Sequence, residues 1–330
     1  MRIEMSSHVR VFAPATVSNV GPGFDVLGLA LKEPGDLVEA EISDAPGVEI
    51  VEVTGDDGQL TTDPTRNVVG VSAQSVLSHL LATGQAGLDP EASGVPGVRL
   101  RLHKQMPLAS GLGSSAASSV AGAVAVNELF GAPLTRRELL AHAMAGERVA
   151  SGAAHADNAA PGLLGGFVLI RSYDPLDVID LPVPAALRIA VVHPHCLVST
   201  QKARALLRGR GFVIEHAVAN LGNLGALVSG LHRGDLELIG RSIEDRMVEP
   251  LRAALIPGYA QVKSAALGAG ALGCSISGSG PSVFAFAGSD EVATRVAAAM
   301  RDAFREAAGL DADCFVGPVN GTGAYRLDLP

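Results

Sequence analysis

The sequence has little of what marks secreted or membrane proteins. Among its 330 residues there is no tryptophan, and the three cysteines, Cys196, Cys274 and Cys314, are far apart and odd in number. A disulfide framework is therefore not expected, and the cysteine usage predicts a reducing cytoplasm. The nearest candidate for a membrane span, residues 116–126, is too short and contains serine and glycine, so no transmembrane helix is predicted. Charged residues stand at the first positions, where a secretory signal needs an apolar run, so we expect no signal peptide.

The chain also lacks an excess of positive charge. It has 25 Lys and Arg against 34 Asp and Glu, a formal net charge of -9, and aromatic residues are not interleaved with basic ones. Proteins that bind nucleic acid usually have the opposite charge balance, so a nucleic-acid partner is not predicted. With 48% hydrophobic and 18% charged residues, the chain does not have the composition of a disordered protein either.

Sequence motifs that bind metals through cysteine or histidine are missing too. There is no CxxC and no HExxH, and only His193 and His195, on either side of one proline, suggest a metal site. We interpret them as two ordinary histidines at the end of a strand, because a pair alone is too few ligands for a typical metal centre.

The spacing of apolar residues predicts an α+β chain in two parts. Alternation with period two and short apolar runs indicate strands over residues 8–13, 24–31, 37–42, 48–53, 98–102, 167–170, 187–192, 283–286, 314–316 and 325–329. Helical spacing covers 67–81, 114–130, a segment opened by the Thr135-x-x-Glu138 capping box, 200–207, parts of 213–254, a segment after Pro257, and 291–308. Strands and helices do not alternate regularly, which favours α+β, and the length suggests about two domains. A loop with prolines after residue 170 marks the expected boundary.

The strongest candidate for chemistry is a glycine–serine stretch, Pro107-Leu108-Ala109-Ser110-Gly111-Leu112-Gly113-Ser114-Ser115-Ala116-Ala117. Its two glycines let the backbone turn sharply and approach a ligand closely. The two serines that follow open a helix of small residues, whose N-terminus offers free N–H groups and a partial positive charge to phosphate. The stretch is neither a Walker A motif, since the lysine is missing, nor a Rossmann fingerprint. It predicts a phosphate site, with a flexible loop before a buried helix as the alternative.

A second candidate lies between the first two predicted strands. Asn19 and Asp25 flank a Gly-Pro-Gly turn in the segment PATVSNVGPGFD. Such a turn can direct both polar groups at one small ligand, but Asn and Asp are also ordinary turn residues. The residues alone leave both interpretations open.

Two further polar clusters are weaker by themselves. Glu147 precedes His155-Ala156-Asp157-Asn158, and one carboxylate beside a phosphate loop suits Mg²⁺, although Glu147 can instead pair with Arg148 on an exposed helix. A second glycine–serine turn, Ser277-Gly278-Ser279-Gly280, is either an anion-binding nest or a tight turn. Arginines such as Arg204 and Arg252 can grip carboxylates, but spacing alone does not select these two.

Together these segments resemble the GHMP kinase superfamily. PLASGLGSSAA is similar to its phosphate loop and GCSISGSGPSVFAF to its C-terminal glycine motif, while PATVSNVGPGFDVLGLAL narrows the resemblance to the homoserine kinase branch. The resemblance implies an N-terminal domain like ribosomal protein S5 domain 2 over residues 1–170 and a ferredoxin-like C-terminal domain over 171–330. It also implies a homodimer and a cytoplasmic enzyme of threonine biosynthesis, which phosphorylates the side-chain hydroxyl of L-homoserine with ATP and Mg²⁺.

The resemblance also assigns roles to residues. It implies that the 107–117 loop wraps the triphosphate, that Asn67 contacts the adenine side, and that Ser115, or Ser114, joins Glu147 on Mg²⁺. The substrate pocket would consist of Asn19, Asp25, His155, Asn158, Thr200, Arg204, Arg252 and Gly280. In this assignment Asn19 and Asp25 hold the amino group and the hydroxyl end, and the two arginines clamp the carboxylate.

The mechanism that the resemblance implies depends on positioning and charge. Ser115, Glu147 and Asn158 are the catalytic candidates, and Asn158 stands where mevalonate and galactokinases have an aspartate base. Asparagine cannot accept a proton, so we hypothesise no dedicated base, with Asp157 as the challenger. The alternatives are another GHMP kinase of the mevalonate or shikimate type, whose substrates have a carboxylate but no amine, and a non-catalytic ligand sensor.

Overall fold

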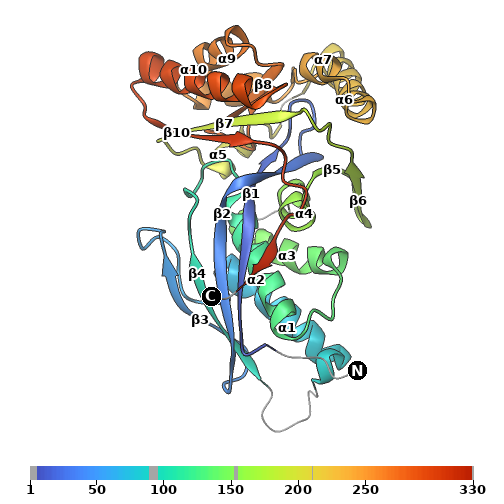
Figure 1. Cartoon of the computed structure of the whole chain (residues 1–330), viewed down its shortest axis with the longest axis vertical. Helices are drawn as coiled ribbons and strands as arrows, with labels where there is room; N and C mark the ends of the chain where they lie inside the picture. Colours follow the sequence, from blue (N-terminus) through green and yellow to red (C-terminus); the bar gives the residue numbers. More distant parts are fainter. Residues whose placement is uncertain (1–5, 89–95, 152–154, 210, 329–330) are drawn as a thin grey trace.

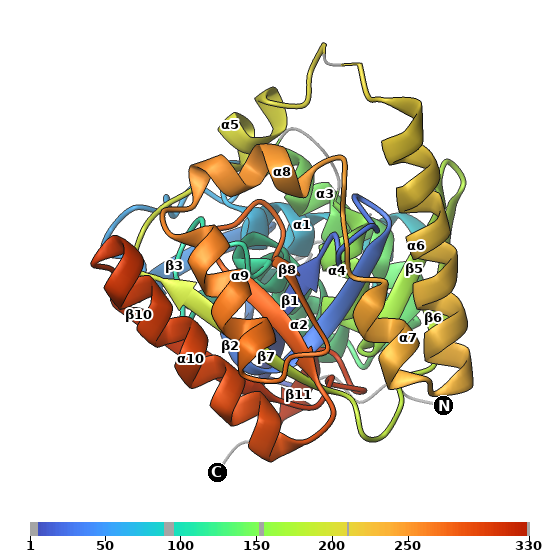
Figure 2. The ribbon, with the colours of Figure 1, turned by 90° about the horizontal axis from the view of Figure 1, so that it is seen from above.

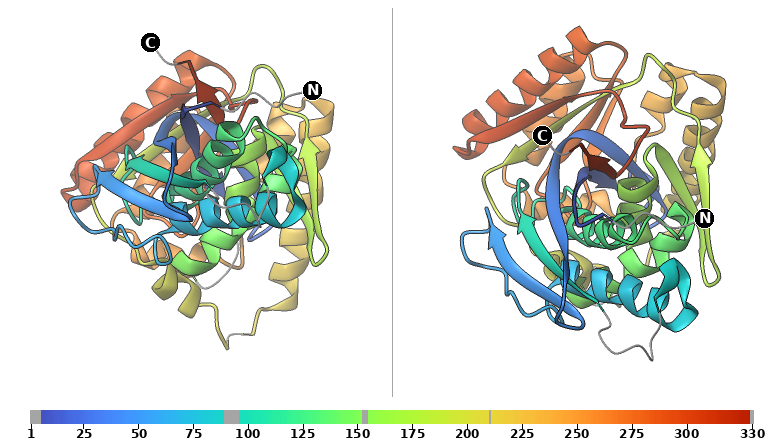
Figure 3. Two further views of the ribbon diagram at one scale, coloured as in Figure 1. Left: turned by 90° about the horizontal axis from the view of Figure 1, so that it is seen from below. Right: turned by 60° about the horizontal axis from the view of Figure 1, so that its bottom comes forward.

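The first of two sheets in the structure contains the first and the last strand of the described chain. The computed structural model describes residues 6–88, 96–151, 155–209 and 211–328. Seven strands form this sheet: β1 (His8–Ser18), β2 (Leu27–Ser43), β3 (Val48–Thr54), β4 (Gly97–His103), β5 (Phe167–Tyr173), β6 (Leu176–Leu181) and β11 (Tyr325–Leu327). Their order is β11-β1-β2-β4-β3, with β5 paired to β2 and β6 to β5. Because β11 pairs with β1, the end of the described chain lies beside its first strand (Figure 3).

Strand β2 joins two strands that the sequence predicted separately. Its first residues pair with β5 and with the end of β1, and its last residues, from Leu37 on, pair with β4 and the start of β1. The predicted strand at 24–31 begins three residues later, because residues 24–26 belong to a turn. Figure 1 shows β1 and β2 running along much of the molecule (blue). The turn that joins them contacts a distant loop, because Asn19 Nδ2 donates to the Gly278 carbonyl.

Four helices cover one face of this sheet: α1 (Val68–Thr83), α2 (Ser114–Leu129), α3 (Arg136–Ser151) and α4 (Ala156–Leu164) (Figure 1). Helix α2 packs against β1, β2 and the other three helices. Nearly all of its residues are buried, which its Ala, Ser and Gly composition permits because small side chains allow close packing. The N-terminus of a central, immobilised helix is thereby fixed in place.

The second sheet has four antiparallel strands in the order β10-β7-β9-β8. They are β7 (Arg188–Pro194), β8 (Gly273–Ile276), β9 (Val283–Ala287) and β10 (Ala312–Gly317). Helices α9 (Tyr259–Gly268) and α10 (Asp290–Ala308) pack together against this sheet. The remaining helices are α5 (Thr200–Ala205), α6 (Ile214–Arg233), α7 (Leu236–Arg241) and α8 (Glu249–Arg252). Seen from above, α6 lies at the outer side of the molecule, away from α10 (Figure 2).

The α+β prediction is confirmed, but three elements were missed. Helix α4 is short and contains Pro161, strand β6 lies in the expected proline loop after Pro175, and β8 lies in a glycine-rich segment. In each, tertiary packing overrides weak local propensity. The division at residue 170 stays a prediction; the first sheet includes β6, which ends at Leu181, and the second begins at Arg188.

The last predicted strand, at 325–329, matches β11 up to Leu327, and Leu329 lies outside the described residues, as do the charged positions near the N-terminus. In the described ranges, none of the helices is long and apolar enough to cross a membrane. Within the same ranges, no group of three or more His, Cys, Asp or Glu side chains is placed to hold a metal ion together. His193 and His195 lie at the end of β7 and pair with Ser282 and Asp313.

Candidate active site

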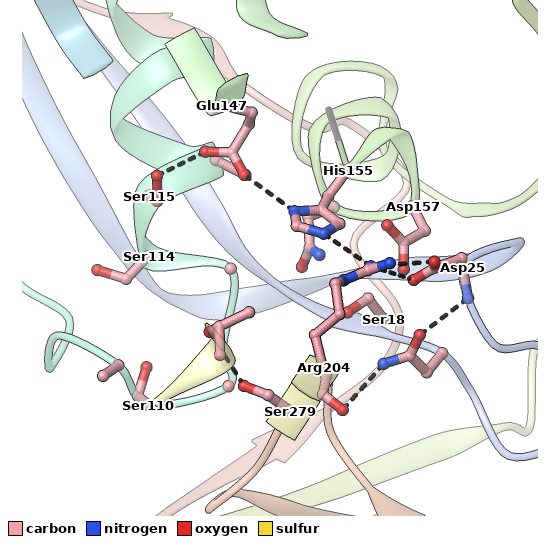
Figure 4. A pocket seen from close by; sticks show the side chains of 18 of the residues that line it. Ser18, Asp25, Ser110, Ser114, Ser115, Glu147, His155, Asp157, Arg204 and Ser279 are labelled. Carbon is pink, nitrogen blue, oxygen red and sulfur yellow. Dashed lines mark hydrogen bonds and ion pairs between the residues drawn. The ribbon is translucent and has the colours of Figure 1, made fainter. Parts of the chain in front are cut away.

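A cleft of about 430 Å³ brings together most of the predicted site residues. Its walls come from the β1–β2 turn, the loop before α2, the α3 and α4 helices, α5, α8 and the second glycine–serine turn. Of the predicted residues, Asn19, Asp25, Ala109, Ser110, Gly111, Gly113, Ser114, Ser115, Ala116, Glu147, His155, Asn158, Thr200, Arg204 and Arg252 line it. Figure 4 shows how the polar side chains converge.

The phosphate loop lies against the second glycine–serine turn. Gly111 and Gly113 have φ of +76° and +66°, a region that favours glycine, and Gly113 directly precedes α2. A Cβ on Gly111 would lie 2.5 Å from the Ser277 carbonyl oxygen. The Ser277 hydroxyl donates a hydrogen bond of 2.7 Å to the Gly111 carbonyl. Only glycine therefore allows these two loops to meet, and their contact holds the α2 N-terminus open to the cleft.

A buried ion pair supports the start of α2 from behind. The Lys104 ammonium pairs with Asp36 and donates to the Ser114 carbonyl at 2.9 Å and to the Ser114 hydroxyl at 2.6 Å. It also reaches the Ser118 hydroxyl, and both charged side chains are essentially unexposed. A charge buried this deeply persists only with such partners. This arrangement was not predicted, since Asp36 and Lys104 are distant in the chain.

Ser115 and Glu147 bring two oxygen ligands together. The Ser115 hydroxyl donates to Glu147 Oε1 at 2.6 Å, and Glu147 is 4% exposed, so the alternative of a carboxylate on an exposed helix is wrong. Burial raises the pKa of the Glu147 carboxyl to about 7, opposed by the Ser115 hydrogen bond and the Lys104 charge. A hydroxyl and a carboxylate next to a phosphate-binding helix are oxygen donors of the kind that Mg²⁺ prefers.

A chain of polar contacts crosses the cleft from Glu147 to Asp25 (Figure 4). His155 Nδ1 lies 4.0 Å from Glu147 Oε2, and His155 Nε2 lies 3.0 Å from Arg204 Nη2. Arg204 Nη2 in turn lies 2.9 Å and 3.0 Å from the two Asp25 oxygens. Burial, and next the Arg204 charge, lowers the pKa of His155. A neutral His155 therefore links the phosphate end of the cleft to a charged pair at the other end.

The turn between β1 and β2 fixes Asp25 at that end. Asn19 Oδ1 accepts from the Asp25 backbone N–H at 2.9 Å, and Asn19 Nδ2 donates to the Gly278 carbonyl at 2.9 Å. The Gly278 carbonyl also accepts from Arg252 Nη1 at 2.7 Å. Asn19 and Asp25 both have positive φ, near +67° and +58°. Both interpretations of the segment therefore apply: Asn19 holds the turn together, and Asp25 faces the cleft.

Asp157 and Asn158 lie side by side at the start of α4. The Asn158 Oδ1 accepts from the Thr16 hydroxyl at 2.8 Å. Asp157 lines the cleft and is 1% exposed, and its Oδ1 has no hydrogen-bond partner within the described part of the chain. Burial, and next the Asp25 charge, raises the pKa of Asp157 to about 7. Two carboxyl groups, Asp25 and Asp157, therefore lie together at the end of the cleft away from the phosphate loop. We call it the acceptor end, after the phosphate acceptor that the sequence resemblance predicts.

Six predicted residues do not line the cleft: Asn67, Pro107, Leu108, Leu112, Ala117 and Gly280. Asn67 caps α1 by accepting from the Val69 N–H, and its amide donates to the Thr61 carbonyl. The Gly280 N–H donates to the Ser277 carbonyl within the turn. Their assigned roles stay predictions. Conversely, the lining includes Ser18, Ser199 and Gln201, which the predictions omitted although each adjoins a predicted residue. It also includes Asp157, Gly278 and Ser279, which the sequence suggested only as a competing base and as part of the second glycine–serine turn.

Comparison with known proteins identifies the family. Residues 72–166 match the profile "GHMP kinases N terminal domain" and residues 227–306 match "GHMP kinases C terminal". The curated homoserine kinase of Chloroherpeton thalassium is 48% identical over 320 residues, covering 96% of this chain and 98% of that protein. The chain belongs to the homoserine kinase family of the GHMP kinases. The resemblance in the sequence motifs is thereby confirmed.

Solved structures of GHMP kinases agree with this membership. A crystal structure of homoserine kinase from Cytophaga hutchinsonii has a TM-score of 0.91 and 50% identity, with 98% of each chain covered. The L. major mevalonate kinase solved with R-mevalonate has a TM-score of 0.72 at 19% identity, covering 96% of this chain and 99% of that one, and shares the fold alone. The expected two-domain GHMP kinase fold is confirmed, and relatives at high identity are homoserine kinases rather than kinases of the mevalonate type.

Proposed function

We propose that the chain transfers the γ-phosphoryl group of ATP to the side-chain hydroxyl of L-homoserine, giving O-phospho-L-homoserine and ADP in threonine biosynthesis. One observation carries this proposal: a single cleft joins an anion-binding helix N-terminus to an end lined by two carboxyl groups and two arginines. Homoserine has one ammonium and one carboxylate, so it complements both charges. Mevalonate and shikimate have a carboxylate and no amine, and would offer no ammonium group to Asp25 and Asp157.

We propose that Ser115 and Glu147 hold Mg²⁺ and that the 107–117 loop receives the triphosphate. The ion would neutralise the phosphate charge that develops during transfer. The 2.6 Å contact between the two side chains and the hard oxygen donors support this assignment. Lys104 would keep the α2 N-terminus in position, since it binds both the carbonyl and the hydroxyl of Ser114. In this assignment Asn67 contacts the adenine side.

At the other end, Asp25 would bind the ammonium group of the substrate and Arg204 and Arg252 its carboxylate, with Asn19, His155, Thr200 and Gly280 completing the pocket. The direct pairing of Arg204 with Asp25 supports a site that handles both charges. Such alignment of two reactants accounts for much of the rate enhancement of kinases.

We further propose that no residue acts as a dedicated base. As the new P–O bond forms and the bond to ADP breaks, the hydroxyl proton would pass to a phosphoryl oxygen or to solvent, while Asn158 orients the hydroxyl. Asp157 is the competing base. If Asp157→Asn abolished turnover while the affinities for ATP and homoserine stayed intact, the base-free mechanism would be wrong.

The test of the reaction is ADP release with MgATP and a panel of L-homoserine, L-serine, L-threonine, mevalonate and shikimate. We expect strong turnover confined to L-homoserine. Turnover of mevalonate or shikimate instead would refute the assigned pocket but leave the kinase chemistry. No turnover of any member, with ATP still bound, would favour a non-catalytic ligand sensor.

We also propose a cytoplasmic homodimer that forms through the outer face of α6. Ile214, Val218 and Leu221 on this helix are 68%, 62% and 69% exposed, and residues 217–231 carry no charged side chain. Contiguous exposed apolar surface of this kind marks interaction sites. A second copy fits it by charge: in an antiparallel pair of α6 helices centred between residues 223 and 224, Glu215 lies opposite the basic His232–Arg233 end of the partner's helix.

Sedimentation velocity tests this dimer with a charge swap. The wild type should be dimeric at micromolar concentration, Glu215→Arg should weaken the dimer at least tenfold, and adding Arg233→Glu should restore it, because both contacts are repeated by the two-fold axis. A monomeric wild type, or a single variant as dimeric as the wild type, would contradict the α6 interface.

A further inference from the structure

Phe24 touches both arginines of the acceptor end, although it does not itself line the cleft. The guanidinium carbon of Arg252 lies 5.1 Å from the centroid of the Phe24 ring and that of Arg204 lies 5.7 Å from it. Both distances are within the range of cation–π attraction, in which the negative face of an aromatic ring stabilises a cation. One neutral ring therefore contacts two like charges at once.

The surroundings of the two guanidinium groups make this contact matter. Arg252 is 4% exposed, and burial lowers its pKa. The Nε atoms of both arginines are buried without a hydrogen-bond partner in the part of the chain that the structure describes. Among the described residues, the polar partners of the guanidinium groups are Asp25 and His155 for Arg204, and the Gly278 carbonyl for Arg252. The aromatic ring thus stabilises two guanidinium groups that lack a hydrogen bond at Nε among the described residues.

Phe24 is also fixed in place by the chain around it. It directly precedes Asp25, whose backbone N–H is held by Asn19 and whose carbonyl accepts from the Tyr173 hydroxyl at 2.7 Å. Phe24 itself is half-buried and borders an apolar cavity of about 520 Å³ that Leu207 and Phe212 also line. Because it is not part of a closely packed interior, its replacement by a smaller apolar residue is compatible with folding.

We propose that Phe24 is a positioning residue for the phosphate acceptor: its ring holds the guanidinium groups of Arg204 and Arg252 together in the orientation that receives the acceptor's carboxylate. Phe24 thereby sets the preference for an amino alcohol that carries a carboxylate over one that does not. The inference rests on the proposed function, in which these two arginines bind that carboxylate. It adds a residue that acts through them and touches no reacting atom.

The test compares two acceptors that differ only in the carboxylate: L-homoserine, and 3-aminopropan-1-ol, which keeps the amine and the hydroxyl. Phe24→Leu keeps an apolar side chain of similar size but removes the aromatic face. We expect it to raise the KM for L-homoserine about tenfold, with the KM for ATP and the kcat/KM for 3-aminopropan-1-ol within twofold of the wild type. The preference for the carboxylate should therefore shrink about tenfold.

Two further variants separate this role from a merely structural one. Phe24→Trp, which retains a strong aromatic face, should restore the preference to within threefold. Phe212→Leu removes a ring from the same apolar cavity but keeps the Phe24 ring beside the arginines, and should leave the preference unchanged. An equal loss with both acceptors, or an unchanged KM for L-homoserine in Phe24→Leu, would overturn the inference. Failure of the wild type to phosphorylate L-homoserine would refute the proposed function itself, whatever the Phe24 variants do.

Discussion

The phosphate end of the cleft consists of neighbouring residues and backbone, whereas the acceptor end consists of charged side chains from distant segments. Residues 109–116 make most of the phosphate end, and their glycines and small side chains set its shape. At the acceptor end, Asp25, Asp157, Arg204 and Arg252 come from the β1–β2 turn, α4, α5 and α8. The first end is local in sequence, and the second exists only once both sheets are folded together.

This contrast predicts which changes affect which substrate. At the phosphate end, a change should act through backbone geometry or the metal, and so through ATP and the rate of transfer. At the acceptor end, a change should act through the balance of charges, and so through the affinity for the amino acid. The four predictions that follow test this separation in order of decreasing effect on turnover.

Glu147→Gln should have the largest effect. It removes the charge proposed to hold Mg²⁺ but preserves the shape of the side chain, so kcat should fall about 10³-fold. Burial raises the pKa of Glu147 to about 7. The ionised carboxylate is therefore a cost to the folded state above that pH, and the variant should be at least as stable as the wild type at pH 8.

Steady-state ADP release at saturating substrates measures this effect, with Glu138→Gln on the same helix as the control. Gln at position 138 can still complete the capping box with Thr135, so the control should keep wild-type rates. A kcat for Glu147→Gln within tenfold of the wild type would show that this carboxylate does not hold the ion.

Asp25→Asn should act on the acceptor alone. Loss of this charge leaves Arg204 half-buried without its carboxylate and removes the proposed partner of the ammonium group. The KM for L-homoserine should rise about 10²-fold, with the KM for ATP within threefold of the wild type. The matched control is Asp290→Asn, which removes an exposed partner of Arg188 and should change neither constant. An equal rise in both KM values would contradict the separation of the two ends.

Gly111→Ala should act on ATP. Its Cβ would approach the Ser277 and Gly280 carbonyl oxygens to 2.5 Å and 2.8 Å, so the two loops must separate. We expect the KM for ATP to rise about tenfold and the unfolding midpoint to fall. Gly234→Ala is the control, since its φ of +65° is similar but its Cβ would meet open space, and it should cost only about 1–2 kcal/mol of backbone strain. Equal destabilisation by both variants would argue against contact between the loops.

Asp157→Asn should affect turnover least and the pH dependence of stability most. The folded state holds the pKa of Asp157 near 7, well above its ordinary value of 3.8, so this group favours the folded state at low pH. That contribution is lost as pH rises from about 4 to about 7, by a few kcal/mol at roughly 1.4 kcal/mol per pKa unit. Urea unfolding between pH 5 and pH 8 should show a flatter profile in the variant. A slope equal to that of the wild type would mean that Asp157 ionises normally.

The same contrast explains how much the sequence could reveal. The phosphate loop, the helix after it and the α+β character follow from glycine spacing and apolar periodicity, which are local properties. Lys104 and Asp157 do not, because the burial of Lys104 depends on Asp36 in the distant strand β2 and that of Asp157 on how α4 packs. The pairing of Asp25 with Arg204 joins positions 179 residues apart. Only a resemblance to known proteins brought those two residues into one predicted site.

When no acceptor is bound, Arg204 and Asp25 neutralise each other's charge across the cleft. A zwitterionic amino acid can enter by exchange: its ammonium group replaces the guanidinium beside Asp25, and its carboxylate receives the guanidinium that is released. Both protein charges then keep a partner of opposite sign. A ligand with an amine alone would leave Arg204 without a partner, and one with a carboxylate alone would leave Asp25 without a partner. In each case a partly buried charge stays unpaired, which costs free energy. The preference for a zwitterion therefore depends on re-pairing the protein charge that binding displaces, as much as on any contact with the substrate.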